Sequence, residues 1–547
     1  MSQTISNAPG EEKATITVVE DVRRGAPTEA VVKKQIDELN AGHAVQMKSQ
    51  FDRLSILEAL STFRKTALIC LVAGFCASTD GYQYQLTSSI VANKGFIRQF
   101  GSVIDGTLKL NPPYVSAFGG LFSAGQVIGQ FCIQWITDWV GRKGAMWTFM
   151  AILILAAIVE SVSSIWWHFA IAKLIAGVGI GACQATLPVY INEHAPVQVR
   201  GLFIVAYNIW WSLGGLMCSI ALYELNANLP YNWKIAIYTQ FAMIGTSLII
   251  FVFLPESTWW LVSKGKIERA RKTLEYRFGA IPGYDIDGEL SIIAVTIEKQ
   301  RQWDREARAE GPLAIFKGLN GKRFLIGSWP KVLQQFVGLG VFSSYSTYFF
   351  QLAGNSNAFQ VTLIQGCLSL LAVILDAMCV DVIGRRKMTL FGFSGACAGV
   401  LIMAIVGCFD YTNKQLGSVL VFSGVLANFC NTFQSSTSYA YLTEMPEQRF
   451  KARATGWGLA YCNLYAVMFN FTIPLMLAKW VVKTAFLFAA LGIPGTVLAY
   501  FVMPESMHRS PAEIHEMFVD HVPLRKWKGY KTSVEADLED RLGHEAI

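Results

Sequence analysis

Apolar runs long enough to cross a bilayer fill most of this chain, and one long polar interval divides them into two groups. The interval reaches from Pro255 to Trp329 and contains no window of roughly 20 uncharged apolar residues, the length that a membrane-spanning helix requires. Six runs of spanning length precede the interval and six follow it. We therefore expect an all-α membrane protein with 12 transmembrane helices in two six-helix halves, joined by a polar linker.

The composition agrees with this class and argues against several others. Hydrophobic residues make up 53% of the chain and charged residues only 16%, against about 25% charged in typical soluble domains. The net charge of +7 is spread along the chain and does not indicate a nucleic-acid partner. No nucleophile elbow, Walker loop or His/Cys metal cluster appears in the sequence. We therefore expect neither an enzyme nor a cofactor or metal site.

Lys and Arg residues in the short gaps between runs indicate the orientation. The gap after the second run holds Arg142 and Lys143, and the gap after the eighth holds Arg385 and Arg386, whereas the gap at 163–167 carries no charge. By the positive-inside rule, the polar linker and both termini then face the cytoplasm. The start of the chain lacks the basic and apolar pattern of a cleaved signal peptide.

The expected layout has five parts. They are a cytoplasmic, largely disordered N-terminus at 1–64, an N-terminal six-helix half at 65–254, a cytoplasmic linker with short helices at 255–329, a C-terminal six-helix half at 330–503 and a cytoplasmic C-terminal tail at 504–547. The expected spans 1 to 12 are 65–90, 114–136, 145–165, 168–190, 201–223, 236–254, 330–352, 360–380, 388–408, 417–442, 456–478 and 484–503.

The two halves carry the same motifs in the same order. Asp138–Lys143 after span 2 is echoed by Asp381–Arg386 after span 8, and Pro255–Ser257 after span 6 recurs as Pro504–Ser506 after span 12. Repeated motifs at nearly one offset indicate a duplicated six-span unit, with parallel repeats related by an axis along the membrane normal. Such a bundle is typical of transport by alternating access, in which two halves rock about a central site.

Charged residues in the repeated loops are candidates for a cytoplasmic gate. We expect them to form an ion-pair network that holds the inner side shut, because an Arg side chain can bond two carboxylate oxygens at once. The alternative is that these charges only set the topology. The expected pairs are Asp138 with Arg142, Glu193 with Arg200, Asp381 with Arg385, and Glu444 with Arg449 or Lys451.

The motifs together are similar to those of a known family. They are D-x-x-G-R-[KR] twice, P-x-Y-x-x-E-x-x-P-x-x-x-R-G from Pro188 to Gly201, and a pair of glutamines in span 7. With them, the chain resembles the sugar-porter branch of the major facilitator superfamily over about residues 65–520. Within that branch, Trp259–Gly265 and Tyr345–Gly354 are similar to fungal maltose and α-glucoside permeases.

The resemblance implies a central site where amides and aromatic rings bind a sugar, since Asn and Gln supply both donors and acceptors. The matching positions are Gln334 and Gln335 in span 7, Asn208 in span 5, Ser369 in span 8 and Tyr439 in span 10. The last three replace the family's usual glutamine, asparagine and tryptophan. Smaller side chains at the sugar contacts would either make room for a disaccharide or weaken the site. For the two glutamines, hydrogen bonding between helices is the alternative role.

The chain departs from the family most at the residues that couple transport to protons. Related symporters have an acid after Gly-Tyr in span 1 and an arginine in span 4, and the permeases have an acid in span 2. Here these positions hold Gln83, Lys173 and Gln126, and an amide cannot exchange a proton near neutral pH. Asp80 remains, on the same helix face as Gln83, where it can pair with Lys173. We therefore expect weak or absent proton coupling.

The function implied by the resemblance is transport of an α-glucoside or disaccharide such as maltose, either facilitative or proton-coupled, across the plasma membrane. A transporter-like sugar sensor is the alternative. It would transport little and would signal through a cytoplasmic partner that binds the tails.

Overall fold

The computed structural model describes residues 56–533 apart from 105, 197–198, 312, 356, 410–412 and 508. The predicted disorder of the N-terminus falls on residues that lie mostly outside this part of the chain. Its described end forms a helix, α3 (Ile56–Thr62).

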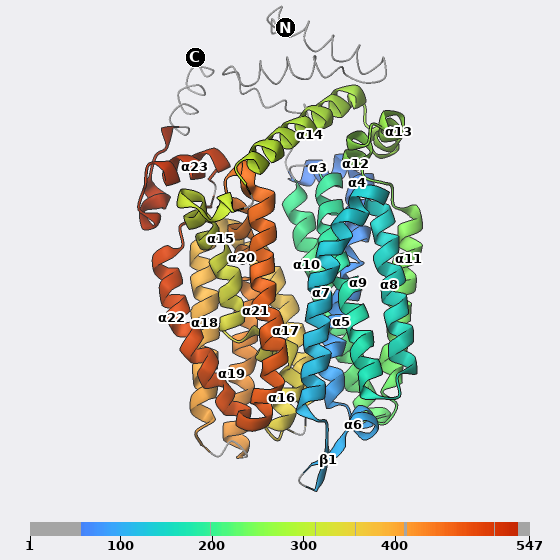
Figure 1. The fold of residues 1–547 in the computed structure, drawn as a ribbon, viewed down its shortest axis with the longest axis vertical. Helices are drawn as coiled ribbons and strands as arrows, with labels where there is room; N and C mark the ends of the chain where they lie inside the picture. Colours follow the sequence, from blue (N-terminus) through green and yellow to red (C-terminus); the bar gives the residue numbers. More distant parts are fainter. Residues whose placement is uncertain are drawn as a thin grey trace, which may run out of the picture.

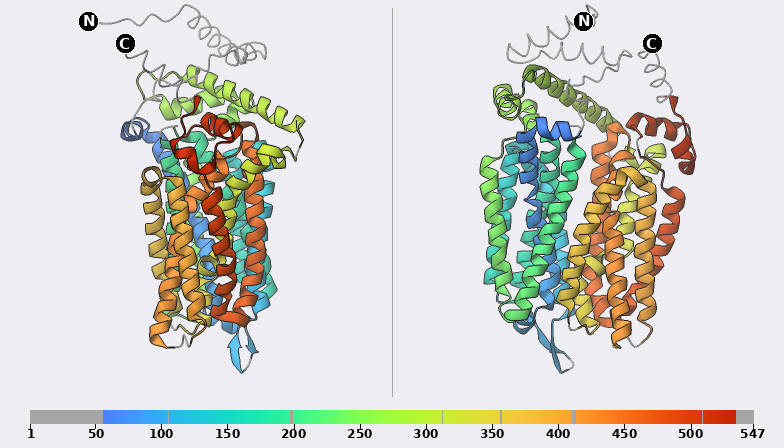
Figure 2. Two further views of the ribbon diagram at one scale, coloured as in Figure 1. Left: turned by 90° about the vertical axis from the view of Figure 1, so that its left-hand side faces the viewer. Right: turned by 180° about the vertical axis from the view of Figure 1, so that it is seen from behind.

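Two bundles of helices stand side by side (Figure 1), and the view from behind also shows them apart (Figure 2, right). The described chain forms twelve transmembrane segments, six in each bundle, which confirms the expected fold class. Eight helical stretches of the described chain are apolar and long enough to cross a membrane.

The segments of the first half are α4 (Arg64–Gly74) with α5 (Ala77–Ser89), α7 (Pro112–Val140), α8 (Arg142–Val162), α9 (Trp166–His194), α10 (Arg200–Asn228) and α11 (Lys234–Phe253). The segments of the second half are α15 (Gly318–Phe336) with α16 (Ser346–Leu352), α17 (Ala358–Ile383), α18 (Arg385–Val406), α19 (Lys414–Phe433) with α20 (Ser435–Glu444), α21 (Lys451–Trp480) and α22 (Ala485–Val502).

Span 1 breaks between α4 and α5, and its second part is polar yet buried. Small residues allow this, because they bring the backbone of α5 against α10. A Cβ atom on Gly81 would lie 1.9 Å from the carbonyl oxygen of Trp211, and one on Gly214 would lie 2.0 Å from that of Ser78. This close approach sets Asp80 deep inside the first half, with 0% of its surface exposed.

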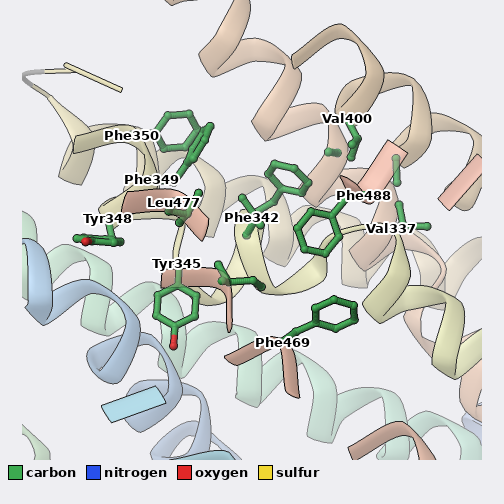
Figure 3. Close-up of a cluster of buried hydrophobic side chains, with 14 of the residues drawn as sticks. Val337, Phe342, Tyr345, Tyr348, Phe349, Phe350, Val400, Phe469, Leu477 and Phe488 are labelled. Atoms are coloured by element: carbon green, nitrogen blue, oxygen red, sulfur yellow. The ribbon is translucent and has the colours of Figure 1, made fainter. Parts of the chain in front are cut away.

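Span 7 is also broken, and it begins earlier than hydropathy predicts. Its helix α15 begins at Gly318 rather than near 330, because the first turns extend beyond the apolar stretch. A turn of π-helix, η4 (Gly340–Ser344), separates α15 from α16. Around this break, the rings of Phe342, Phe469 and Phe488 gather in one apolar cluster (Figure 3).

The linker forms helices that reach across both halves. They are α12 (Thr258–Ser263), α13 (Ile267–Phe278), α14 (Ile286–Ala309) and the 3-10 turn η3 (Ala314–Phe316). Helix α14 runs from the first half to the second (Figure 1). Arg301 donates to the carbonyl of Ser263 on one side (3.0 Å), and Arg453 donates to the carbonyl of Ala307 on the other (2.7 Å). We call this side of the bundle the linker end.

The opposite side, the hairpin end, carries elements that the sequence did not predict. They are the 3-10 turn η1 (Ile90–Ala92), α6 (Lys94–Phe100) and an antiparallel hairpin of β1 (Ser102–Ile104) and β2 (Thr107–Lys109). The hairpin projects away from the bundle (Figure 1).

The described part of the C-terminal tail is folded against the second half. It forms α23 (Pro511–Val519) and the 3-10 turn η7 (Leu524–Gly529). A further 3-10 turn, η5 (Gln448–Phe450), lies in the second half between α20 and α21. Trp527 is fully buried. Arg323 at the start of α15 donates to the carbonyl of Met445 (2.8 Å) and contacts His515 of α23 (3.0 Å).

Candidate functional site

Asp80 lies inside the first half without the partner expected for it. Its Oδ2 accepts a hydrogen bond from Nε2 of Gln184 on α9 at 3.0 Å. Its Oδ1 has no hydrogen-bond partner among the described residues, although the Trp211 side chain lies close to the carboxylate. The expected pairing with Lys173 is wrong, because Lys173 contacts Glu160 of α8 instead, at 2.9 Å.

Glu160 is a buried acid that the sequence analysis overlooked. The carboxylate lies 2.9 Å from Lys173, and it accepts hydrogen bonds from Gln83 (2.7 Å) and Gln240 (3.0 Å). Both charged side chains are 0% exposed. The signal was present, because Glu160 lies inside expected span 3, and an ionisable residue inside a membrane helix is expensive and indicates a function.

The amide at position 83 therefore has a definite structural role. Gln83 stands where the sequence resemblance implies a coupling acid, and its side chain donates a hydrogen bond from α5 to the Glu160 carboxylate. Gln126, the other amide at a coupling position, is half-buried on α7, and its backbone packs closely against Gly181 of α9.

A row of amides leads from Asp80 across to the second half. Gln184 accepts from Nε2 of Gln130 on α7 (3.1 Å), and Gln130 in turn accepts from Nδ2 of Asn463 on α21 (2.7 Å). A separate bond joins the same two helices, from Nδ2 of Asn470 to Oγ of Ser123 (2.7 Å). Sequence reasoning missed these residues, since a polar residue in a span does not reveal which helix it faces.

The second half also contains a buried carboxylate that was not predicted. Asp376 of α17 is 3% exposed, and its Oδ2 accepts from the backbone N–H of Ser436 (3.3 Å) at the break between α19 and α20. An acid at the N-terminus of a helix is stabilised by the helix dipole.

The five predicted sugar-binding residues lie on four helices and vary in exposure. Gln334 is buried, and its Oε1 has no partner among the described residues, whereas Gln335 is half-buried with its Nε2 4.0 Å from Sγ of Cys462. Ser369 accepts from Asn428, and the ring of Tyr439 lies 3.8 Å from Nζ of Lys331. Asn208 is half-buried on α10. These contacts do not bring the five side chains together directly, so any shared site depends on a ligand between them.

Ion pairs at the linker end form the same cluster in each half. Arg142 lies 2.7 Å from Glu193 and 4.0 Å from Asp138, and Arg385 pairs with Glu444. Backbone N–H groups of both arginines bond a carboxylate of the Pro-Glu-Ser motifs, at 2.9 Å in the first half and 3.0 Å in the second. In the first half this carboxylate belongs to Glu256, and its burial raises the pKa above the ordinary value.

Several expected gate pairs are therefore wrong. Glu193 pairs with Arg142 rather than Arg200, and Glu444 pairs with Arg385. Arg449 contacts Glu310 and Glu447 instead of Glu444, whereas Lys451 lines a pocket with Glu444 and its charge acts on that carboxylate without a direct ion pair among the described residues. The side chain of Asp381 lies outside the described residues. The pair of Arg142 with Glu193 and the pair of Arg385 with Glu444 each stay within one half, so these two pairs fix helix ends and do not clamp the halves together in this conformation.

We expect the double variant Arg142→Ala/Arg385→Ala to reach the membrane but to transport slowly. Without the guanidiniums, Glu193 and Glu444 lose their charged partners, and the ends of α8 and α18 lose their fixed positions during rocking. Uptake normalised to surface level checks this. Full uptake would leave the charges with a topological role only.

Comparison with known proteins agrees with this architecture. The model of the sugar (and other) transporter family matches residues 69–518. The chain belongs to this family. Family members with similar sequences include the general alpha-glucoside permease of Saccharomyces cerevisiae, 26% identical over 94% of this chain and 84% of the permease. The low-affinity glucose transporter HXT3 of the same yeast is 24% identical over 83% of this chain and 82% of its own length.

A solved family structure has the same fold. The xylose transporter XylE of Escherichia coli in an inward-open conformation superimposes with a TM-score of 0.66 and 19% identity, over 82% of this chain and 99% of XylE. Membership in the family makes the chain a multi-pass membrane protein of the sugar transporter type, with the resemblance to fungal permeases confirmed.

Proposed function

We propose that this chain carries an α-glucoside disaccharide, with maltose as the first candidate, across the plasma membrane by alternating access. The observation that carries the proposal is the side chain of Gln334, whose buried Oε1 has no hydrogen-bond partner among the described residues. Gln335, next to it on α15, is half-buried. Amides of this kind offer both donors and acceptors to sugar hydroxyls. The similarity to an α-glucoside permease over most of the chain supports the substrate class.

The contacts between halves support a rocking mechanism. At the hairpin end, Ser89 of α5 and Thr347 of α16 share a hydrogen bond of 2.9 Å, and Gln351 donates to the carbonyl of Ala92 at 3.1 Å. At the linker end, the arginine pairs remain within each half. Opening toward the hairpin end would break the bonds of Ser89 and Gln351 across the halves but leave the arginine pairs intact, as expected when each half moves as a rigid body.

Asp80 is our candidate for the proton-carrying group. Its carboxylate is buried and has no cationic partner among the described residues, whereas Glu160 is bonded to a lysine and two amides. A carboxylate without a fixed counter-charge can gain a proton more readily than one that is held by a cation. This argument favours proton coupling more than the sequence alone does.

The test is uptake of labelled maltose by cells that lack their own transporters. We expect uptake with the wild-type chain, and we expect Gln334→Ala and Gln335→Ala each to weaken sugar binding by roughly 1–3 kcal/mol, the cost of an unmet polar partner. Asn431→Ala serves as a matched control with unchanged sugar binding expected, since the Asn431 amide accepts a hydrogen bond from Gln434 within the second half and neither residue is a candidate sugar contact. Normal uptake by both glutamine variants would place the site elsewhere.

A sensor function is the second candidate, and the folded tail favours it. Arg509 donates to the carbonyl of Trp527 (3.1 Å), and a capping box of Ser510 and Glu513 starts α23, so the tail presents an ordered surface. A sensor would bind maltose with little uptake, and removal of residues 510–547 would abolish the cellular response without changing binding. Rapid maltose uptake would contradict this candidate.

A further inference from the structure

Four side chains from four helices form one continuous chain of hydrogen bonds across the two halves. It begins at Asp80 on α5, passes through Gln184 on α9 and Gln130 on α7, and ends at Asn463 on α21, with lengths of 3.0, 3.1 and 2.7 Å. The last bond is a contact between the first half and the second. We propose that the charge on Asp80 sets the strength of this contact between the halves, so that a proton taken up at Asp80 loosens it.

The charged carboxylate fixes the direction of every bond in the chain. An ionised Asp only accepts, so Gln184 must present its NH₂ group to Asp80 and has its oxygen left for Gln130. The same logic makes Gln130 donate to Gln184 and accept from Asn463. One negative charge therefore orients three amides in a row.

Protonation of Asp80 removes the fixed donor-to-acceptor direction of these hydrogen bonds and also the negative charge that strengthens them. Hydrogen bonds to an ionised group are roughly twice as strong as neutral ones, and bonds in a row polarise each other in a low-dielectric interior. A neutral Asp80 can also donate, which allows Gln184 to turn its amide. The bond between Gln130 and Asn463 then loses the support of the charge, and the contact between α7 and α21 weakens.

Among the described residues, no cationic side chain is paired with the Asp80 carboxylate. The titratable groups that face it are the hydroxyl of Tyr207 on α10, the thiol of Cys183 on α9 and the hydroxyl of Tyr84 on its own helix. Helices α7, α11 and α16 also pack against α5, and the described contacts give Asp80 no charged side chain from any of them. Lys173 is held by Glu160.

The same two helices provide a matched control. Asn470 of α21 bonds Ser123 of α7 at 2.7 Å, the same length as the bond from Asn463 to Gln130. The described contacts give neither Asn470 nor Ser123 a link to Asp80. Loss of this bond removes an equivalent contact between the halves but leaves the chain from Asp80 intact.

The inference rests on alternating access, but its test uses no sugar, so its failure is separate from a wrong substrate. Hydrogen–deuterium exchange of the full chain in liposomes is compared at pH 5 and pH 8, after correction for intrinsic amide exchange. We expect faster exchange around Asn463 at pH 5 in the wild type. We expect loss of this pH difference in Asp80→Asn, Asn463→Ala and Gln130→Leu, and its retention in Asn470→Ala.

Other outcomes overturn the proposal. They are a wild-type chain without the pH difference, a difference that survives in Asn463→Ala and Gln130→Leu, or its loss in Asn470→Ala. Asn463→Ala and Gln130→Leu both break the chain of hydrogen bonds. If one of them misfolds, which fast exchange throughout the bundle would reveal, the other still tests the proposal.

Discussion

We expect Lys173→Met and Glu160→Gln each to lower the free energy of unfolding of the purified chain by about 3–5 kcal/mol, because each leaves an uncompensated polar or charged group in a fully buried site. Both side chains of the pair are 0% exposed, so bulk water does not reach either one to replace the lost partner. The double variant Lys173→Met/Glu160→Gln should recover part of the loss, since replacing both members of a buried ion pair is often close to neutral.

Thermal unfolding in detergent, followed by the loss of the monodisperse peak, measures this effect. Lys234→Met is the control, because Lys234 is only half-buried, at the start of α11 over the ring of Trp233. Single variants as stable as the wild type, or a double variant less stable than either single one, would show that the pair is not a stabilising unit.

Asp80→Asn should abolish accumulation of maltose against its gradient while exchange of maltose across the membrane continues. The substitution removes the only carboxylate of α5, and the amide cannot take up a proton near neutral pH. Exchange survives because the candidate sugar contacts on α15, α17 and α20 are untouched. Wild-type accumulation should collapse when a protonophore is added.

Glu160→Gln tests whether the assignment is specific to Asp80. Glu160 is already bonded to Lys173 and two amides, so we expect its variant to lose stability but to keep protonophore-sensitive accumulation in the folded fraction. Accumulation by Asp80→Asn that a protonophore still abolishes would move the proton-carrying role away from Asp80.

The sequence was sufficient to predict the membrane spans and the repeat. The spans were predictable because bilayer thickness sets the length of each apolar run. The repeat was predictable because the motifs that contain Arg142 and Arg385 recur in the sequence, and the structure places both arginines in equivalent ion pairs. The pairing of Asp138 with Arg142 is local, because the two residues lie four apart in the sequence on either side of the turn at Gly141 between α7 and α8.

Partners on different helices could not be predicted in the same way. Lys173 turns toward α8 rather than α5, because helix rotation and the close packing of α5 on α10 decide which side chains meet. The same reason explains the pairing of Glu193 with Arg142. Glu160 and Asp376 are different, since both lay inside expected spans and a search for any acid within a span would have found them.

Counterflow tests the central claim most directly. The purified chain is placed in liposomes loaded with unlabelled maltose, and entry of labelled maltose from outside is followed without any ion gradient. Alternating access to one sugar site predicts a transient accumulation of label, reduced in the variant Gln334→Ala/Gln335→Ala. Label that enters no faster than into liposomes without the protein would contradict the account.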